Sequence, residues 1–397
     1  MRATRSSRRK RRRRIPSRRM LRPIRLLPKS SRRPPPSSPM PPREVAALFL
    51  AIFQARHTPL YTLPRVDCAI PLALPIVNCT KKDTRIEHLL DEAEQHGLCA
   101  IAADDNQRRR LGFRVEHGEL VNPHPGLYIR ADVWNGLNPT KRKRAMVRAL
   151  ARIHPDRVFA AESAVCMFDL EQPYDIHPEH ELTIASPSRS GIHVFAKTGF
   201  IKRTLYVPNM QAMSINGVRV TSLARTLFDC ARLLPFECML PIADSAAKAG
   251  FDMASLTQFP TTRFDEINSI ARLLTYTDPL SDNGGKSRAR AVMIAGGYMM
   301  PYLQYPCPNP DNPAFPLRVD FIWFLPGDVT VVGEYDGMAK YGNTWTEVNT
   351  HVTKQCKRDA YLRKRGVTTI VHFSFDDVIH RELLYRKLDD AGIPRMH

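Results

Sequence analysis

Two short apolar runs near the C-terminus predict a β-hairpin. Residues 317–323 and 329–336 are rich in β-branched and aromatic side chains, and the intervening Pro326-Gly327-Asp328 is typical of a turn. Glu334 and Asp336 are two residues apart, so they face the same side of a regular strand. Together with Asp320 in the first run, they are expected to gather at one end of the hairpin.

Carboxylates beside an apolar strand surface need a compensating partner, because burying an unpaired charge costs several kcal/mol. Oxygen ligands near one point suit Mg²⁺, which takes one or two protein carboxylates and completes its shell with water and phosphate. Lys340 follows closely enough to add a positive charge beside this group. The alternative is that Asp320 and Glu334 form structural salt bridges with Arg318, Lys340 or Lys286.

The surrounding periodicity completes an α/β unit. Gly296-Gly297 and Gly366 stop two helical stretches, the second of which has apolar residues at Val348, Val352, Cys356, Ala360 and Leu362. The predicted elements are, in order, a helix at 287–294, the hairpin, a helix at 347–365, a strand at 367–373 and a helix at 376–390 capped near Ser374.

A different pattern occupies residues 84–130. Apolar residues recur at helical spacing before Gly97, and a second helical stretch at 102–116 contains Arg108, Arg109 and Arg110. Two short strands then flank a Pro-His-Pro-Gly turn. This layout predicts a winged helix, whose second helix and wing can contact phosphates or a groove of DNA. The alternative is a helix with a solvated basic face.

The middle of the chain reads as an α+β region. We expect a basic amphipathic helix at 141–154, a packed helix at 159–168, strands at 181–185, 192–195 and 204–207, and a helix at 223–232 capped by Thr221 or Ser222. Ser163, His177 and Asp169 are too generic a set for a catalytic triad, so we interpret them as structural.

Most of the chain's positive charge lies at its N-terminus. The chain has 397 residues and a formal net charge of +20, and residues 1–43 contain 17 Arg and Lys without an acidic residue, so the remainder carries only +3. This Arg/Pro-rich tail, to residue 81, is predicted to be disordered and able to bind phosphate backbones. The alternative is that translation begins downstream of it. No segment is long and apolar enough to predict a membrane span.

The eight cysteines form neither a CxxC pair nor a Cys/His zinc spacing. Cys166, Cys230 and Cys238 have apolar neighbours and are expected to be core residues. Reduced thiols of this kind are typical of a cytoplasmic protein.

Three segments resemble a known nuclease-like family. They are RVDFIW at 318–323, VVGEYDGMAKY at 331–341 and RDAYLRKRG at 358–366. They resemble the C-terminal domain of a family related to very-short-patch-repair (Vsr) endonucleases, within the PD-(D/E)xK superfamily. The resemblance implies a restriction-endonuclease-like α/β domain at 279–397. Its implied site has Asp320 and Glu334 holding Mg²⁺, Asp336 orienting water and Lys340 stabilising phosphate charge.

The N-terminal half resembles a second family. The order helix, basic helix and GELVNPHPGLYIR at 118–130 is similar to the winged helix of abortive-infection type IV antitoxins (AbiEi), which are often joined to the Vsr-like domain. This resemblance implies a multi-domain α/β protein with a winged helix at 82–135 and an antitoxin-like α+β domain at 136–278. Its implied partners are DNA and a cognate toxin or other protein, with no membrane. The basic residues expected to contact DNA are Arg108, Arg109, Arg110, Lys354, Lys357 and Arg358.

The chain departs from the nuclease pattern at two positions. Relatives often carry Glu on the first helix of the domain, where Lys286 stands here, and Asp336 replaces the superfamily Lys. Two functions therefore remain: a DNA-binding, antitoxin-like or defence-associated protein with a degenerate nuclease fold, or a Mg²⁺-dependent DNA endonuclease. Direct contact of the Lys286 ammonium with Asp320 and Glu334 would favour the first, because the lysine would take the place of the metal.

Overall fold

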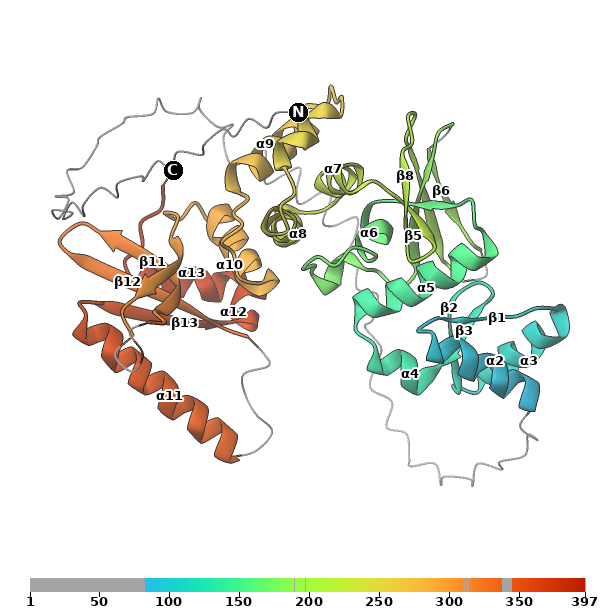
Figure 1. Cartoon of the computed structure of the whole chain (residues 1–397), viewed down its shortest axis with the longest axis horizontal. Helices are drawn as coiled ribbons and strands as arrows, with labels where there is room; N and C mark the ends of the chain where they lie inside the picture. The colour runs from blue at the N-terminus through green and yellow to red at the C-terminus, as the bar shows by residue number, and fades with distance from the viewer. Residues whose placement is uncertain are drawn as a thin grey trace, which may run out of the picture. The chain divides into compact units, whose positions relative to one another are not determined.

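The computed structural model describes residues 83–396 except 189, 197, 310, 311, 313 and 338–344, and describes no side chains at 345–351 (Figure 1). The predicted tail at 1–81 and the predicted site residue Lys340 lie outside these residues. The described chain is a mixed α/β structure with three separate sheets.

Residues 84–130 form two helices and a small sheet. Helices α2 (Thr84–Gln95) and α3 (Asp105–Glu116) begin at the N-caps Asp83 and Asp104, whose carboxylates accept backbone N–H bonds. The sheet contains β1 (Ala100–Ile101), β2 (Leu120–His124) and β3 (Leu127–Arg130), in the order β1-β3-β2. The predicted order of helix, basic helix and hairpin is present, and β1 is an addition to it. Ile86, Leu90, Leu111, Leu120 and Tyr128 belong to its core.

The middle region follows through α4 (Ala131–Gly136) and α5 (Pro139–Ile153). Its six-stranded sheet has the order β6-β7-β5-β4-β9-β8. These strands are β4 (Val158–Phe159), β5 (Glu181–Ser186), β6 (Gly191–Val194), β7 (Ile201–Tyr206), β8 (Ala212–Ile215) and β9 (Val218–Thr221). The helix predicted at 159–168 was wrong in extent. Phe159 belongs to β4, where it pairs with Ile184 and Val220, so only α6 (Ala161–Val165) is helical.

Helices then connect the middle region to the C-terminal sheet: α7 (Leu223–Leu233), α8 (Phe236–Lys248), α9 (Phe264–Tyr276) and α10 (Gly284–Ala295). Ser222 caps α7, as predicted. Helix α10 packs against α8, and there Arg290 Nη2 lies 2.7 Å from Asp244 Oδ1 with both side chains buried. The predicted core cysteines Cys166, Cys230 and Cys238 are buried.

The C-terminal sheet has the order β10-β11-β12-β13. Strands β10 (Tyr302–Cys307), β11 (Leu317–Leu325) and β12 (Val329–Asp336) are antiparallel, and β13 (Thr369–Ser374) runs parallel to β12. Helix α11 (Trp345–Lys364) connects β12 to β13, and α12 (Phe375–Ile379) and α13 (Arg381–Asp390) follow. The predicted closing helix is therefore two helices, separated at His380, and Ser374 forms the expected cap as a capping box with Asp377.

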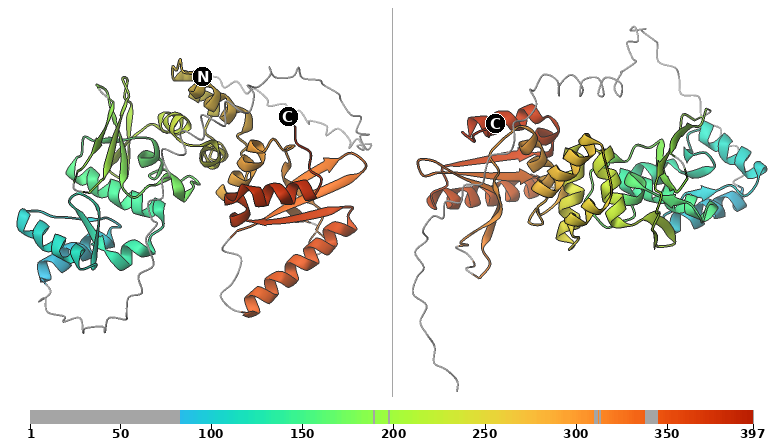
Figure 2. Two further views of the ribbon diagram at one scale, coloured as in Figure 1. Left: turned by 180° about the vertical axis from the view of Figure 1, so that it is seen from behind. Right: turned by 90° about the horizontal axis from the view of Figure 1, so that it is seen from above.

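The two faces of this sheet are covered differently. Phe321, Trp323 and Phe373 pack with residues of α10 and α13, whereas Ile322 and Val332 pack with Leu362 of α11. Helices α11 and α13 thus lie on opposite faces (Figures 1 and 2). Of the apolar positions predicted along α11, Leu362 faces the sheet, whereas Val352, Cys356 and Ala360 are exposed, and the Val348 side chain lies outside the described residues. The half-buried residues of α11 are instead mostly polar: Gln355, Arg358, Asp359 and Tyr361.

None of the helices in the described part of the chain combines the length and apolar character needed to cross a bilayer.

Candidate functional site

A row of polar residues crosses all four strands of the C-terminal sheet. Gln304 stands opposite Asp320, because its neighbours Leu303 and Tyr305 pair with Phe321 and Val319. Asp320 in turn lies one step beyond the pair Phe321–Gly333, which places it opposite Glu334. The row ends at His372, the partner of Glu334 on β13. The hairpin therefore brings Asp320 and Glu334 together, as the sequence predicted.

Asp320 has hydrogen-bond partners on both carboxylate oxygens. Its Oδ1 accepts from Gln304 Nε2 at 3.2 Å and lies 2.8 Å from Lys286 Nζ. Its Oδ2 accepts the backbone N–H of Tyr335 at 3.0 Å. Asp320 is only 7% exposed, so its charge is neutralised by a protein cation rather than by solvent.

Lys286 reaches this carboxylate from the first turn of α10. Asn283 caps that helix by accepting the Lys286 backbone N–H, and the ammonium also lies 2.7 Å from Asp282 Oδ2. Burial alone lowers the pKa of the Lys286 ammonium, but hydrogen bonds to Asp282 and Asp320 outweigh it, so the pKa is raised. Lys286 is therefore a fixed positive charge, in direct contact with Asp320.

Glu334 pairs with a different cation. Arg358 Nη2 of α11 lies 2.8 Å from Glu334 Oε1 and also bonds the carbonyl of Arg318. Burial raises the pKa of the Glu334 carboxyl, and the negative charge of Asp320 raises it further. The positive charge of Arg358 partly offsets this rise. Among the described residues, Asp320 is therefore paired with Lys286 and Glu334 with Arg358.

Asp336, the last residue of β12, lies beside a histidine between two acids. His372 Nδ1 is 3.5 Å from Asp336 Oδ2, and His372 Nε2 is 2.9 Å from Asp359 Oδ2 on α11. Gln355 Nε2 also lies 2.8 Å from His372 Nδ1. Local patterns did not predict the grouping of Asp359, Gln355 and His372. The available signals were the histidine within the mainly apolar β13 and the aspartate of the motif at 358–366.

This arrangement does not fit Mg²⁺ as it stands. A metal shared by Asp320 and Glu334 would lie beside two cations that already pair with these acids, the Lys286 ammonium at Asp320 Oδ1 and the Arg358 guanidinium at Glu334 Oε1. Within the described residues, no three His, Cys, Asp or Glu side chains are grouped so as to hold a metal ion. The predicted metal ligands are thus adjacent, but they are engaged in ion pairs.

The residues predicted to contact DNA fall into two groups. Arg108, Arg109 and Arg110 are exposed on α3, although Arg108 pairs with Asp105 at 2.6 Å and Arg110 pairs with Asp83. Lys354 and Lys357 are exposed on α11, whereas Arg358 faces the sheet.

Comparison with known proteins gives distant relatives. No family model matches the chain, and no solved structure does. Two uncharacterized proteins of Mycobacterium tuberculosis, MT2308 of strain CDC 1551 and Rv2248 of strain H37Rv, are each 24% identical over 283 residues. The alignment covers 68% of this chain and 91% of each relative, so the likeness spans most of their length.

Proposed function

We propose that this protein binds DNA as an antitoxin-like or defence-associated factor, and that its C-terminal domain is a nuclease-like fold whose site is closed by its own cations. The observation that carries this proposal is the 2.8 Å contact between Lys286 Nζ and Asp320 Oδ1. An ammonium at that position provides the positive charge that a divalent ion would otherwise supply.

Electrostatics supports a site that is occupied by the protein's own cations. Two nearly buried carboxylates on facing strands repel each other, and each is neutralised by one cation. A metal entering the site would have to compete with the Lys286 ammonium at Asp320 and with the Arg358 guanidinium at Glu334. Breaking either ion pair costs free energy that the bound metal would have to recover.

The order of elements supports the nuclease-like assignment. Helix α10, three antiparallel strands, helix α11 and a parallel strand follow in the chain, and the expected helix, hairpin, helix and strand are among them. The Vsr-like motifs place their acids on the central strands β11 and β12. The chain therefore matches the expected nuclease-like domain in its order of elements and in the strands that carry the two acids.

The DNA-binding part of the proposal rests on exposed cations. Three arginines in succession lie on α3, and Lys354 and Lys357 lie on α11. Such side chains bind phosphates without reading sequence, and a helix followed by a hairpin wing is a common way of presenting them to DNA. A protein partner such as a toxin remains part of the same proposal.

A nicking assay on supercoiled plasmid tests the closed site. The full chain is incubated with Mg²⁺, Mn²⁺ or EDTA, and gel shifts are measured in parallel on the same preparation. We expect DNA binding without nicking in any of the three conditions. Metal-dependent nicking that disappears in Asp320→Ala would refute the closed site and establish the endonuclease.

One observation favours that second function. The Lys286 ammonium contacts Asp282 as well as Asp320, so it can keep one ion pair when it gives up the other. Asp320 and Glu334 would then face each other with one cation fewer between them, and such a pair of carboxylates attracts a divalent ion. In that case the same residues would serve a Mg²⁺-dependent DNA endonuclease.

A further inference from the structure

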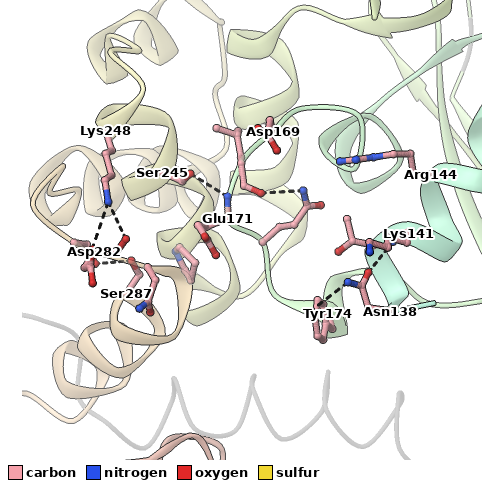
Figure 3. Close-up of a pocket in the computed structure, with 16 residues that line it drawn as sticks. Asn138, Lys141, Arg144, Asp169, Glu171, Tyr174, Ser245, Lys248, Asp282 and Ser287 are labelled. Carbon is pink, nitrogen blue, oxygen red and sulfur yellow. Dashed lines mark hydrogen bonds and ion pairs between the residues drawn. The ribbon is translucent and has the colours of Figure 1, made fainter. Parts of the chain in front are cut away.

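A second site lies apart from the polar row. An open pocket of about 480 Å³ is lined by the first turns of α5, the segment 169–174, the C-terminal part of α8 and the start of α10 (Figure 3). Its volume falls within the range of small-molecule sites, roughly 300–1,000 Å³. The proposed function does not use this pocket.

One wall of the pocket is cationic. Lys141 and Arg144 are three residues apart on α5, so they share a face of that helix, and both line the pocket. Figure 3 shows them entering from the same side. Arg144 Nε donates to the Cys166 carbonyl at 2.7 Å, which fixes the guanidinium in place. Within the described residues, neither side chain forms an ion pair, so both charges are available to a ligand.

The next part of the wall is acidic. Asp169 and Glu171 line the pocket between α5 and the start of α10 (Figure 3). The backbone N–H of Glu171 donates to Ser245 Oγ at 2.9 Å. In the described part of the chain, neither the Asp169 nor the Glu171 carboxylate forms an ion pair. Lys248 and Asp282, on the far side, already pair with each other, with Nζ donating to the Asp282 carbonyl at 2.8 Å.

The pocket also contains an aromatic surface. Tyr174 lines it and is 55% exposed, and its hydroxyl accepts a hydrogen bond from Asn138 Nδ2 at 3.4 Å. Leu170 and Pro241 add apolar area. A flat aromatic ring that is half exposed beside a pocket is suited to stacking on a heterocycle.

These charges select a ligand that carries both signs of polarity. A simple anion would face Asp169 and Glu171, and a simple cation would face Lys141 and Arg144, so each would be repelled by half of the pocket. The pocket is also larger than an inorganic ion requires. The ligand must therefore present a phosphate or similar anion at one end and N–H donors at the other.

We propose that this pocket binds a nucleotide whose base carries an exocyclic amine, with the phosphate on Lys141 and Arg144, the amine on Asp169 or Glu171, and the base against Tyr174. A free nucleotide and one nucleotide of a single strand offer the same groups. Asp282 of the pocket wall bonds Lys286, which contacts Asp320 of the polar row. No residue of that row lines the pocket, so this proposal and the proposed function can fail separately.

Calorimetric titration of the full chain tests it with matched ligands. AMP presents all three groups, ribose 5-phosphate lacks the base, adenosine lacks the phosphate, and UMP lacks the exocyclic amine. We expect AMP to bind at least 10-fold more tightly than each of the others. Equal affinities for AMP and ribose 5-phosphate would overturn the proposal, because they would indicate attraction by bulk positive charge alone. An undetectable AMP signal would overturn it as well.

Variants assign the binding to the pocket. Lys141→Ala is expected to weaken AMP binding about 10-fold and to leave adenosine binding unchanged. The double variant Asp169→Asn, Glu171→Gln is expected to remove the preference for AMP over UMP, and a preference that persists in it would overturn the assignment. Arg152→Ala, an exposed cation on the same helix that does not line the pocket, is the matched control. An equal loss in Lys141→Ala and Arg152→Ala would refute the assignment. Thermal unfolding of each variant verifies its fold, which matters most for Arg144→Ala because Arg144 holds the Cys166 carbonyl.

Competition with an oligoadenylate distinguishes a free nucleotide from a nucleotide within a single strand. If the oligoadenylate displaces AMP at a lower concentration than free AMP does, and Lys141→Ala weakens the oligoadenylate as it weakens AMP, the ligand is single-stranded nucleic acid. Failure of the strand to displace bound AMP assigns it to the free nucleotide. A strand that displaces AMP equally well in Lys141→Ala would refute the pocket as its site.

Discussion

The ammonium of Lys286 lies 2.8 Å from the carboxylate of Asp320, and the same ammonium lies 2.7 Å from Asp282. One lysine therefore joins the start of α10 to the middle of β11. Position 286 is where the resemblance to Vsr-like nucleases places an acid, so the chain has a cation in contact with the acid that was expected to bind metal.

Reversing this charge should create metal dependence. We expect Lys286→Glu to destabilise the protein by roughly 3 kcal/mol without metal, because Asp282, Asp320 and the new carboxylate repel one another. Adding 10 mM Mg²⁺ or Mn²⁺ should then raise the melting temperature of this variant by about 2–4 °C, while the wild type stays unchanged. Lys364→Glu, at the exposed end of α11, is the control. A wild-type melting temperature that rises with Mg²⁺ as much as that of the variant would contradict the closed site.

Replacing Arg358 should mainly lower stability, whereas replacing the neighbouring Lys357 should mainly lower DNA affinity. Arg358 bonds Glu334 and the Arg318 carbonyl, so we expect Arg358→Ala to cost about 1–3 kcal/mol in urea unfolding, with less effect on DNA binding. Lys357 is exposed, so Lys357→Ala should change stability by less than about 0.5 kcal/mol and weaken a gel shift. The opposite pattern would show that Arg358 turns outward to bind DNA.

Arg108, Arg109 and Arg110 of α3 should account for part of the salt dependence of DNA binding. We expect their joint replacement by alanine to weaken DNA binding and to reduce the slope of log K against log salt by about 1 for each phosphate that these arginines neutralise. The N-terminal tail contributes the same background in every variant. Arg85→Ala, an exposed cation on α2, is the control. An unchanged slope would remove α3 from the DNA-binding surface.

Local patterns predicted the hairpin acids and the order of elements in the C-terminal unit, because β-branched runs and turn residues are short-range signals. They missed strand β10, where Pro306 and Gln304 interrupt the apolar pattern. They also missed that Arg358 faces Glu334 and that Val352 faces outward. The orientation of α11 depends on which residues satisfy the buried acids of the sheet, and spacing within the helix carries no information about that.

Gly285 should be intolerant of substitution. A Cβ at this position would lie 2.5 Å from the Tyr335 hydroxyl oxygen and 2.7 Å from ring carbons, so α10 or the ring must move. We expect Gly285→Ala to lower stability by roughly 1–3 kcal/mol and to disturb Tyr335, whose backbone N–H bonds Asp320. Gly112→Ala, on α3 with open space around its Cβ, should instead stabilise by about 0.5–1 kcal/mol. Thermal and urea unfolding of both variants measure the contrast, and a neutral Gly285→Ala would argue against the close approach.

Acid should destabilise the protein through a buried histidine. Burial lowers the pKa of His124 to about 4, and the positive charges of Arg157 and Lys202 add to the effect. The unfolded chain takes up this proton near pH 6.5 and the folded chain does not, so stability falls as pH decreases from about 6.5 toward 4. His124 should contribute a slope of up to about 1.4 kcal/mol per pH unit in urea unfolding, and the buried His177, whose pKa burial lowers to about 3, adds to it. The His124 contribution should be lost in His124→Phe, which keeps a ring against Phe200. An unaltered slope would show that other groups cause the acid sensitivity.

The buried pair Arg290–Asp244 has a consequence for how the chain can be divided. Cutting at residue 278, between α9 and α10, would leave the Asp244 carboxylate on one fragment and the Arg290 guanidinium on the other. Each charge would then lie in a largely apolar surface without its partner. Neither fragment should be stable when expressed alone, and mixing the two should restore a stable complex. The middle and C-terminal regions are therefore expected to unfold together, in a single cooperative transition.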